Sequence, residues 1–204
     1  MLESLYSNFK DIFNTTWPMV FVSLVILVSF RLSYLYKNKV KVVLYKEIFL
    51  FFFAFYILCL FQIVTSTDIS ASYGNNFIPF KEITRYKLFS ALFMKNVVGN
   101  MLLFVPYGYF VGRYFAGKSK ALSIFLITLA SCAIEYTQLS IGRVFDVDDI
   151  LLNVLGGIIG YFFFLFSDRI YNNLPKFFKS LWFLNTIFII LLTIFIIFLT
   201  LLLI

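Results

Sequence analysis

The chain of 204 residues contains no histidine, and only 13% of its residues are charged. Without histidine the sequence lacks the commonest general base and metal ligand, so any chemistry has to use carboxylates, amides or hydroxyls. The two cysteines, Cys59 and Cys132, lie in separate apolar runs and lack the paired spacing of a disulfide framework or a zinc site. The hydrophobic share of 62% and the mean hydropathy of +0.95 exclude a soluble globular protein.

Apolar runs of membrane-spanning length are what the chain has instead. A helix needs about 20 apolar residues to cross a bilayer, and six segments reach or approach this length: residues 17–36, 48–67, 96–112, 121–141, 150–167 and 181–204. We therefore expect an all-α integral membrane protein, a single membrane domain over residues 1–204 with about six transmembrane helices in one bundle. Membrane lipids are its first expected partners.

The 17 basic residues separate these apolar runs and do not gather on one face, so we expect no nucleic-acid partner. Their distribution between alternate connections predicts the orientation, because Lys and Arg are retained in the cytoplasm. Both chain ends and residues 67–95 are then expected outside. The larger group, expected in the cytoplasm, is Arg31, Lys37, Lys39, Lys41, Lys46, Arg113, Lys118, Lys120, Arg169, Lys176 and Lys179.

The connection between the second and third spans, residues 67–95, is too mixed in composition for a plain linker. Over residues 80–93 the apolar side chains Ile83, Leu88 and Leu92 are separated from the basic ones, which favours a short helix lying on the membrane surface. An irregular surface loop is the alternative.

Polar residues inside the spans are costly in lipid and are therefore candidates for function. In the third span, Asn96 and Asn100 are four residues apart and are expected on one helix face. In the fourth span, Glu135 and Gln138 also share a face. A buried ion pair that joins two helices is the structural alternative for Glu135.

The connection that follows, residues 142–149, carries one cation and three carboxylates. Arg143 offers a planar fork of donors for a carboxylate or a phosphate. Asp146, Asp148 and Asp149 supply the negative charge, and N-capping of the next helix is an alternative role for Asp148 or Asp149. Asn153 lies one turn after Asp149. Since all these polar residues fall toward one end of their spans, we expect a shared polar pocket that faces the outside.

Glycines recur at helix-contact spacing in two of the spans. Gly108 and Gly112 form one G-x-x-x-G pattern, and Gly156 and Gly160 form another. Small residues let membrane helices approach closely, so these glycines predict helix packing rather than chemistry.

Three blocks of the sequence resemble the VanZ-like membrane protein family. They are Asn-Phe-Ile-Pro-Phe at residues 76–80, the pattern N-x-x-x-N with a following P-x-G at residues 96–108, and the pattern E-x-x-Q, G-R, D-D, N-x-x-G-G at residues 135–157. The resemblance covers residues 67–167 as a core, with residues 17–66 and 181–204 as additional membrane helices. It implies a bacterial plasma-membrane protein of the cell envelope with a role in low-level resistance to the glycopeptide antibiotic teicoplanin.

Two hypotheses of function follow. In the first, the pocket binds a lipid-linked cell-wall precursor, another envelope component or the glycopeptide, through Asn76, Asn96, Asn100, Gln138, Arg143, Asp146 and Asn153. In the second, the protein is an intramembrane enzyme that modifies an envelope lipid or glycan, with Glu135, Asp148 and Asp149 as acid/base residues or as ligands to a divalent cation such as magnesium or manganese. A transporter and a purely structural scaffold are further alternatives; the sequence names no cofactor.

Overall fold

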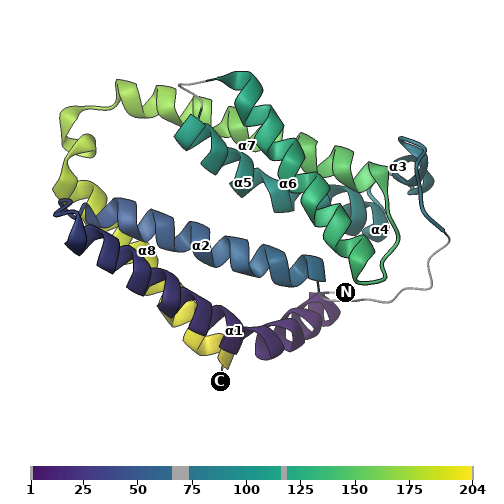
Figure 1. Ribbon diagram of the computed structural model, residues 1–204, viewed down its shortest axis with the longest axis horizontal. Helices are drawn as coiled ribbons and strands as arrows, with labels where there is room; N and C mark the ends of the chain where they lie inside the picture. The colour runs from purple at the N-terminus through teal and green to yellow at the C-terminus, as the bar shows by residue number, and fades with distance from the viewer. Residues whose placement is uncertain (1, 66–73, 116–118, 204) are drawn as a thin grey trace. The chain divides into compact units, whose positions relative to one another are not determined.

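The computed structural model describes residues 2–65, 74–115 and 119–203, and in this part of the chain the regular secondary structure is helical, apart from one isolated bridge between Asn76 and Asp146 (Figure 1). Five helices are long and apolar enough to cross a membrane: α1 (Leu2–Lys37), α2 (Leu44–Thr65), α6 (Lys120–Ser140), α7 (Val147–Asn173) and α8 (Leu181–Leu203). Thr67, the first residue of the predicted core, and Lys118 lie outside the described residues.

The third predicted span, residues 96–112, lies within a run of three consecutive helical pieces. These are α4 (Ala91–Phe93), the π-helical η1 (Met94–Val98) and α5 (Gly99–Phe115). Every predicted span thus contains a long helix, and the prediction of an all-α membrane protein is confirmed. The chain divides into two compact units, unit 1 (Met1–Ser66 and Leu174–Ile204) and unit 2 (Thr67–Asn173).

Unit 1 joins α1, α2, the short 3₁₀ helix η2 (Lys176–Lys179) and α8. The backbone N–H of Tyr45 donates to Asn185 Oδ1 at 3.0 Å, and the rings of Phe52 and Phe55 meet Phe195 with centroids 5.1 and 4.9 Å apart. Because residue numbers rise together in both helices, α2 and α8 run parallel. The connection from α1 to α2 is closed by an ion pair, in which Arg31 Nε lies 2.9 Å from Glu47 Oε2.

Unit 2 packs α5 and α7 against each other with almost no side chain between them. A Cβ added at Gly108 would overlap the carbonyl oxygen of Gly157, and one added at Gly156 would overlap that of Met101. Gly160 meets Val105 in the same way. These contacts confirm that the glycines serve helix packing, because only a residue without a Cβ permits this approach.

The direction of the helices in unit 2 follows from contacts at their two ends. Asn100 bonds Asp149 near the start of α5 and α7, and Ser167 bonds the Tyr109 hydroxyl further along both helices. The two helices are therefore parallel. The antiparallel α6 packs against them through Ile127, which is fully buried beside Gly157.

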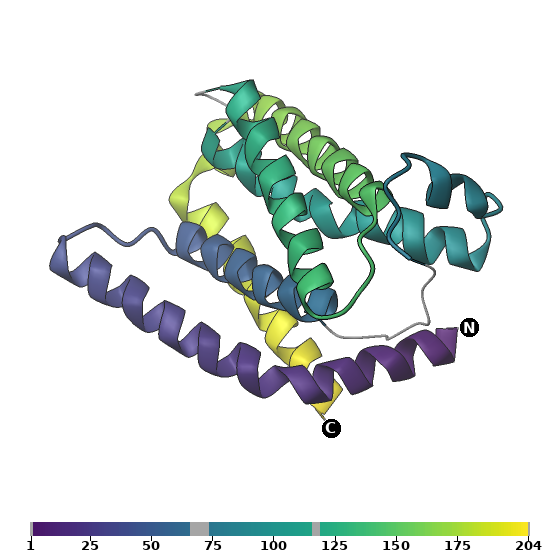
Figure 2. The same cartoon turned by 45° about the vertical axis from the view of Figure 1, so that its right-hand side comes forward.

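The expected surface helix over residues 80–93 is not continuous. The structure has α3 (Lys81–Arg85) and then a non-helical stretch before α4 begins at Ala91. The helix ends because Tyr86 adopts an extended conformation, and Phe89 just before α4 has a left-handed φ of 59°, as does Phe80 just before α3 with a φ of 67°. Figure 2 shows these short helices beside the connection between α6 and α7.

Candidate functional site

The end of α6 and the start of α7 carry a chain of hydrogen bonds through Glu135. Glu135 is 1% exposed, and its Oε1 accepts the backbone N–H of Asp146 at 2.6 Å. In the amide orientation that satisfies both of its ends, Gln138 donates to Glu135 Oε2 at 3.0 Å and accepts from Arg143 Nη1 at 2.8 Å. The Arg143 backbone N–H also donates to the Gln138 carbonyl at 3.0 Å. Gln138 therefore couples the buried carboxylate to the half-buried guanidinium.

Asp146 caps α7 and joins it to the segment around Asn76. Its Oδ1 accepts the backbone N–H of Asp148 at 2.9 Å and the side-chain amide of Asn76 at 2.8 Å. The Asn76 backbone N–H donates to Phe145 O, and the Val147 N–H donates to Asn76 O. Asp146 lies outside the spans, and burial raises the pKa of its carboxyl group above the ordinary value. The N-capping hypothesis for Asp148 or Asp149 is thus wrong, because the capping carboxylate belongs to Asp146.

Asp148 holds the residues that lead into α3. One carboxylate oxygen accepts the backbone N–H of Phe80, and the other accepts those of Glu82 and Ile83 at 2.7 and 3.2 Å. The side chain is 1% exposed. A buried carboxylate is stable in such a position because several amide donors replace its lost hydration.

Asp149 connects α7 to α5, since its Oδ1 accepts from Asn100 Nδ2 at 2.6 Å. Asn153, one turn further along, is buried, and Asn96 is half-buried in η1. The side chains of these two asparagines form no hydrogen bond with the described residues. Asn96 lies in the π-helical η1 and Asn100 in α5, and of the two only Asn100 bonds the Asp149 carboxylate.

Eight of the ten candidate residues therefore lie together in what we name the polar cluster. Hydrogen bonds join six of them, Asn76, Glu135, Gln138, Arg143, Asp146 and Asp148, and the hydrogen-bonded pair Asn100 and Asp149 adjoins these at Asp148. Asn76, Glu135, Gln138 and Asp148 are buried at this end of unit 2, and the other four members, Asn100, Arg143, Asp146 and Asp149, are half-buried.

Sequence reasoning missed two contributors. Asn75 Oδ1 accepts the Phe145 backbone N–H at 3.1 Å, and the rings of Phe77 and Phe145 stack with centroids 5.2 Å apart. The adjacent Asn75 and Asn76 were a usable signal, because asparagine side chains commonly bond nearby backbone in turns. The backbone donors around α3 gave no signal, since every non-proline residue carries the same N–H group.

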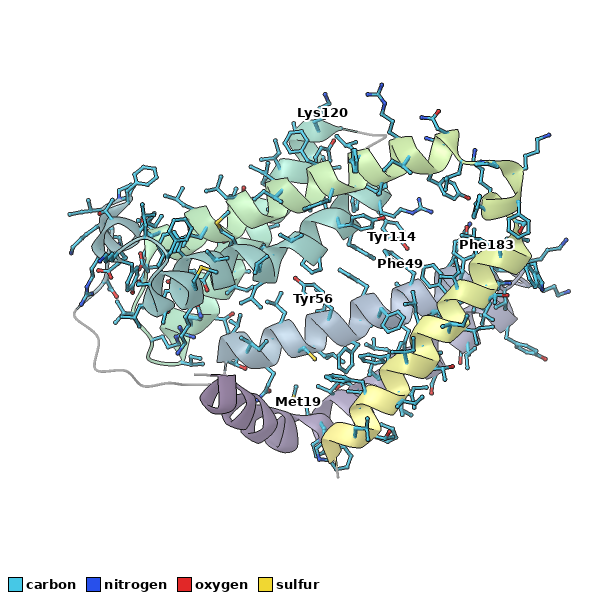
Figure 3. All side chains as sticks on the ribbon, turned by 180° about the vertical axis from the view of Figure 1, so that it is seen from behind. Met19, Phe49, Tyr56, Tyr114, Lys120 and Phe183 are labelled. Carbon is cyan, nitrogen blue, oxygen red and sulfur yellow. The ribbon has the colours of Figure 1, made fainter. Side chains whose placement is uncertain are left out.

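An apolar cavity of about 200 Å³ lies between α6 and α7, away from the cluster. Ile127, Ile158 and Tyr161 line it together with Lys120, which projects from the start of α6 (Figure 3), and none of the ten candidate residues lines it. Within the described residues, no group of three or more cysteine, aspartate or glutamate side chains is arranged to hold a metal ion. The side chains of the cluster offer hydrogen bonding, ion pairing through Arg143 and proton exchange at carboxylates.

Comparison with known proteins gives the family. No curated protein and no solved structure matches the chain. A family model described as VanZ/LLP1 matches residues 47–168, which is more than half of the chain and includes most of α2 and the whole polar cluster. The match confirms the resemblance seen in the sequence, and the chain belongs to the VanZ/LLP1 family.

Proposed function

We propose that this multi-pass membrane protein acts in the bacterial plasma membrane, where Arg143 and its neighbours bind an anionic group of an envelope component or of a glycopeptide and so lower sensitivity to teicoplanin. The observation that carries the proposal is the chain Glu135–Gln138–Arg143, which holds a half-buried guanidinium at the end of two spans. A guanidinium fixed in this way binds carboxylate or phosphate with little loss of side-chain freedom.

The members of the polar cluster have different roles in this proposal. Asp146 and Asp148 serve structure, because their oxygens already accept hydrogen bonds from α7, Asn76 and the residues around α3. Arg143 provides the charge for the ligand, and Gln138 and Glu135 fix its position. Asn96 and Asn153 supply neutral hydrogen bonds, since their amides are not engaged by the described residues.

Over the alternate connections of the whole chain, 11 of the 17 basic residues fall on the side opposite the polar cluster and 6 fall on its own side, which supports an outward orientation for this site. Arg113 at the end of α5, Lys120 at the start of α6 and Arg169 near the end of α7 lie at the end of unit 2 opposite the polar cluster. Basic residues close to span ends are retained in the cytoplasm, so the cluster would face the outside, where glycopeptides and wall precursors are found.

Drug susceptibility tests the proposal directly. A glycopeptide-sensitive Gram-positive host would express wild type, Arg143→Gln or Arg113→Gln at equal membrane levels. We expect wild type and Arg113→Gln to raise the inhibitory concentration of teicoplanin, and Arg143→Gln to lose this protection. Arg113→Gln is the matched control because it removes the same charge from an exposed position at the other end of unit 2. Equal protection by all three proteins would refute a binding role for Arg143.

A second variant separates binding from catalysis. Glu135→Gln keeps the shape of the side chain but removes its charge, and we expect it to weaken protection because Gln138 then loses its anionic acceptor. Suppose instead that wild type leaves susceptibility unchanged but alters the envelope lipids, and that Glu135→Gln abolishes this alteration. The enzyme hypothesis, with Glu135 and Asp149 as its acid/base residues, would then replace the binding proposal.

A further inference from the structure

A patch of exposed apolar side chains lies on unit 2 outside the long helices. Over residues 77–92, which we name the surface segment, six large apolar side chains are each more than half exposed: Phe77, Ile78, Phe80, Leu88, Phe89 and Leu92. A concentration of this kind marks a surface that contacts a partner or a membrane.

The backbone holds two of these rings in an outward position. Phe80 and Phe89 adopt left-handed φ values of 67° and 59°, a conformation that is unfavourable for bulky residues. The Phe80 N–H is bonded to the Asp148 carboxylate, and the Ser90 N–H to the Lys87 carbonyl at 3.0 Å. Phe80 is 60% exposed and Phe89 85% exposed, so the unfavourable backbone does not serve to bury either ring in the described structure.

The attachment of the surface segment fixes its level relative to the bilayer. It leads directly into α4, η1 and α5, and Asp148 at the start of α7 ties it to a second span. A segment held between the starts of two membrane helices lies where those helices meet the membrane surface. Figure 2 shows it beside the connection between α6 and α7.

Charge indicates which surface the segment meets. Within and just beyond it are Lys81, Arg85, Lys87 and Lys95, against one acidic residue, Glu82. Glu82 pairs with Arg85 at 3.1 Å, so Lys81, Lys87 and Lys95 remain as exposed positive charge around the apolar side chains. Exposed aromatic and aliphatic groups flanked by lysines are the composition that binds anionic membranes.

From these observations we propose that the surface segment inserts into the bilayer interface at its own end of unit 2, with Phe80 and Phe89 among the acyl chains and Lys81 and Lys87 on anionic phospholipid headgroups. The hydrogen bonds of Asp148 connect the surface segment to the polar cluster, so the depth of the segment in the membrane fixes the depth of the cluster. A ligand with a lipid tail would then approach Arg143 along the membrane surface.

Quenching of tryptophan fluorescence by brominated lipids tests the insertion. The full chain, with its two native tryptophans replaced as Trp17→Phe and Trp182→Phe, would carry Phe89→Trp or Phe80→Trp and be reconstituted into phosphatidylcholine–phosphatidylglycerol vesicles. Gly74→Trp is the control, because it lies before the segment and a Cβ there meets no atom within 4 Å. We expect brominated acyl chains to quench positions 80 and 89, and aqueous iodide to quench position 74.

Headgroup selectivity is tested with bromine carried either by phosphatidylglycerol or by phosphatidylcholine at equal mole fraction. We expect stronger quenching at position 89 by the anionic lipid, and loss of that preference in Lys81→Gln/Lys87→Gln. Iodide quenching without lipid quenching at positions 80 and 89, or protection from both quenchers, would overturn the insertion. Equal quenching by the two lipids would overturn the anionic preference.

Discussion

The two units bring membrane helices together by different means. In unit 1 the most apolar helix, α8, has a mean hydropathy of 2.7 over its apolar stretch, yet no residue of that stretch is buried. In unit 2, α7 has a lower mean hydropathy of 2.1, and 39% of its apolar stretch is buried. Of these two helices, the one that forms buried contacts is therefore the less apolar one, which carries glycines and polar residues.

The physical reason is that lipid tails are as apolar as the side chains they touch. Helices in a bilayer gain little from apolar burial and associate through close packing and hydrogen bonds. In unit 1, aromatic rings such as Phe55 and Phe195 meet edge to face and keep α2 and α8 apart. In unit 2, Gly108 and Gly157 bring α5 and α7 into backbone contact.

The largest effect on the contrast between the two units is expected at the backbone contact between α5 and α7. Gly108→Ala places a Cβ against the Gly157 carbonyl, and we expect it to destabilise unit 2 by about 3 kcal/mol or to prevent folding. Gly99→Ala is the matched control, since its Cβ would lie 3.6 Å from Met94 O and alanine stabilises a helix by about 0.5–1 kcal/mol over glycine. Thermal unfolding of the two purified variants in detergent measures the difference. Equal unfolding temperatures for the two variants would show that the contact between Gly108 and Gly157 does not limit the stability of unit 2.

The next largest effect is expected at Asp148. Asp148→Ala leaves the backbone N–H groups of Phe80, Glu82 and Ile83 without their acceptor, at a cost of about 2 kcal/mol. Hydrogen exchange at these amides should accelerate strongly, while α8 in unit 1 keeps its protection. Glu82→Gln is the control, because it removes a carboxylate from the same region that takes part only in an exposed ion pair. Unchanged exchange in Asp148→Ala would contradict the assigned role.

A smaller effect is expected for the ion pair of unit 1. Arg31 and Glu47 retain 40% and 21% side-chain exposure, so solvent screens their attraction. A double-mutant cycle with Arg31→Gln and Glu47→Gln should give a coupling of about 0.5 kcal/mol in unfolding experiments. A coupling as large as that of a fully buried pair, about 3 kcal/mol, would remove the contrast between the two units.

The smallest effect concerns the pH dependence of unit 2. Burial raises the pKa of Asp146 in the folded protein, so the folded state binds this proton more tightly than the unfolded state. The contribution of Asp146 to stability is therefore complete below the unfolded pKa of about 3.9 and is lost as the pH rises through the folded value. Asp146→Asn retains an acceptor for Asp148 and Asn76, and it should lose less stability than wild type over this range. The measurement is the free energy of unfolding of both proteins across a pH series. Parallel dependence on pH for wild type and Asp146→Asn would show that Asp146 does not cause the loss of stability.

The apolar runs along the sequence were enough to locate the spans and to choose the fold class, because a run of about 20 apolar residues has few alternatives to a membrane helix. The extent of α1 was not evident. Lys10 and Asp11 interrupt the apolar pattern, but the helix continues through them to Leu2. Hydropathy detects the part of a helix suited to lipid and not the part that extends beyond it.

At the candidate site, the residue types were evident and their partners were not. Glu135, Gln138 and Arg143 were recognisable because charged groups near a span need a partner. The use of Asp148 to hold the residues around Phe80 could not be foreseen, since its partners are backbone amides some 65 residues earlier. The left-handed conformation of Phe80 could not be predicted from the sequence either. Local backbone preference disfavours it for phenylalanine, and the hydrogen bond that holds it comes from the distant Asp148.

The long-range bonds of Asp148 also impose an order of events during biosynthesis. A chain emerges from its N-terminal end, so the residues around α3 leave the ribosome while their carboxylate acceptor has not yet been synthesised. The surface segment consequently remains without its anchor while α5 and α6 are being made, and it takes its final conformation only when the first turn of α7 arrives. Completion of that turn therefore finishes the assembly of this end of unit 2.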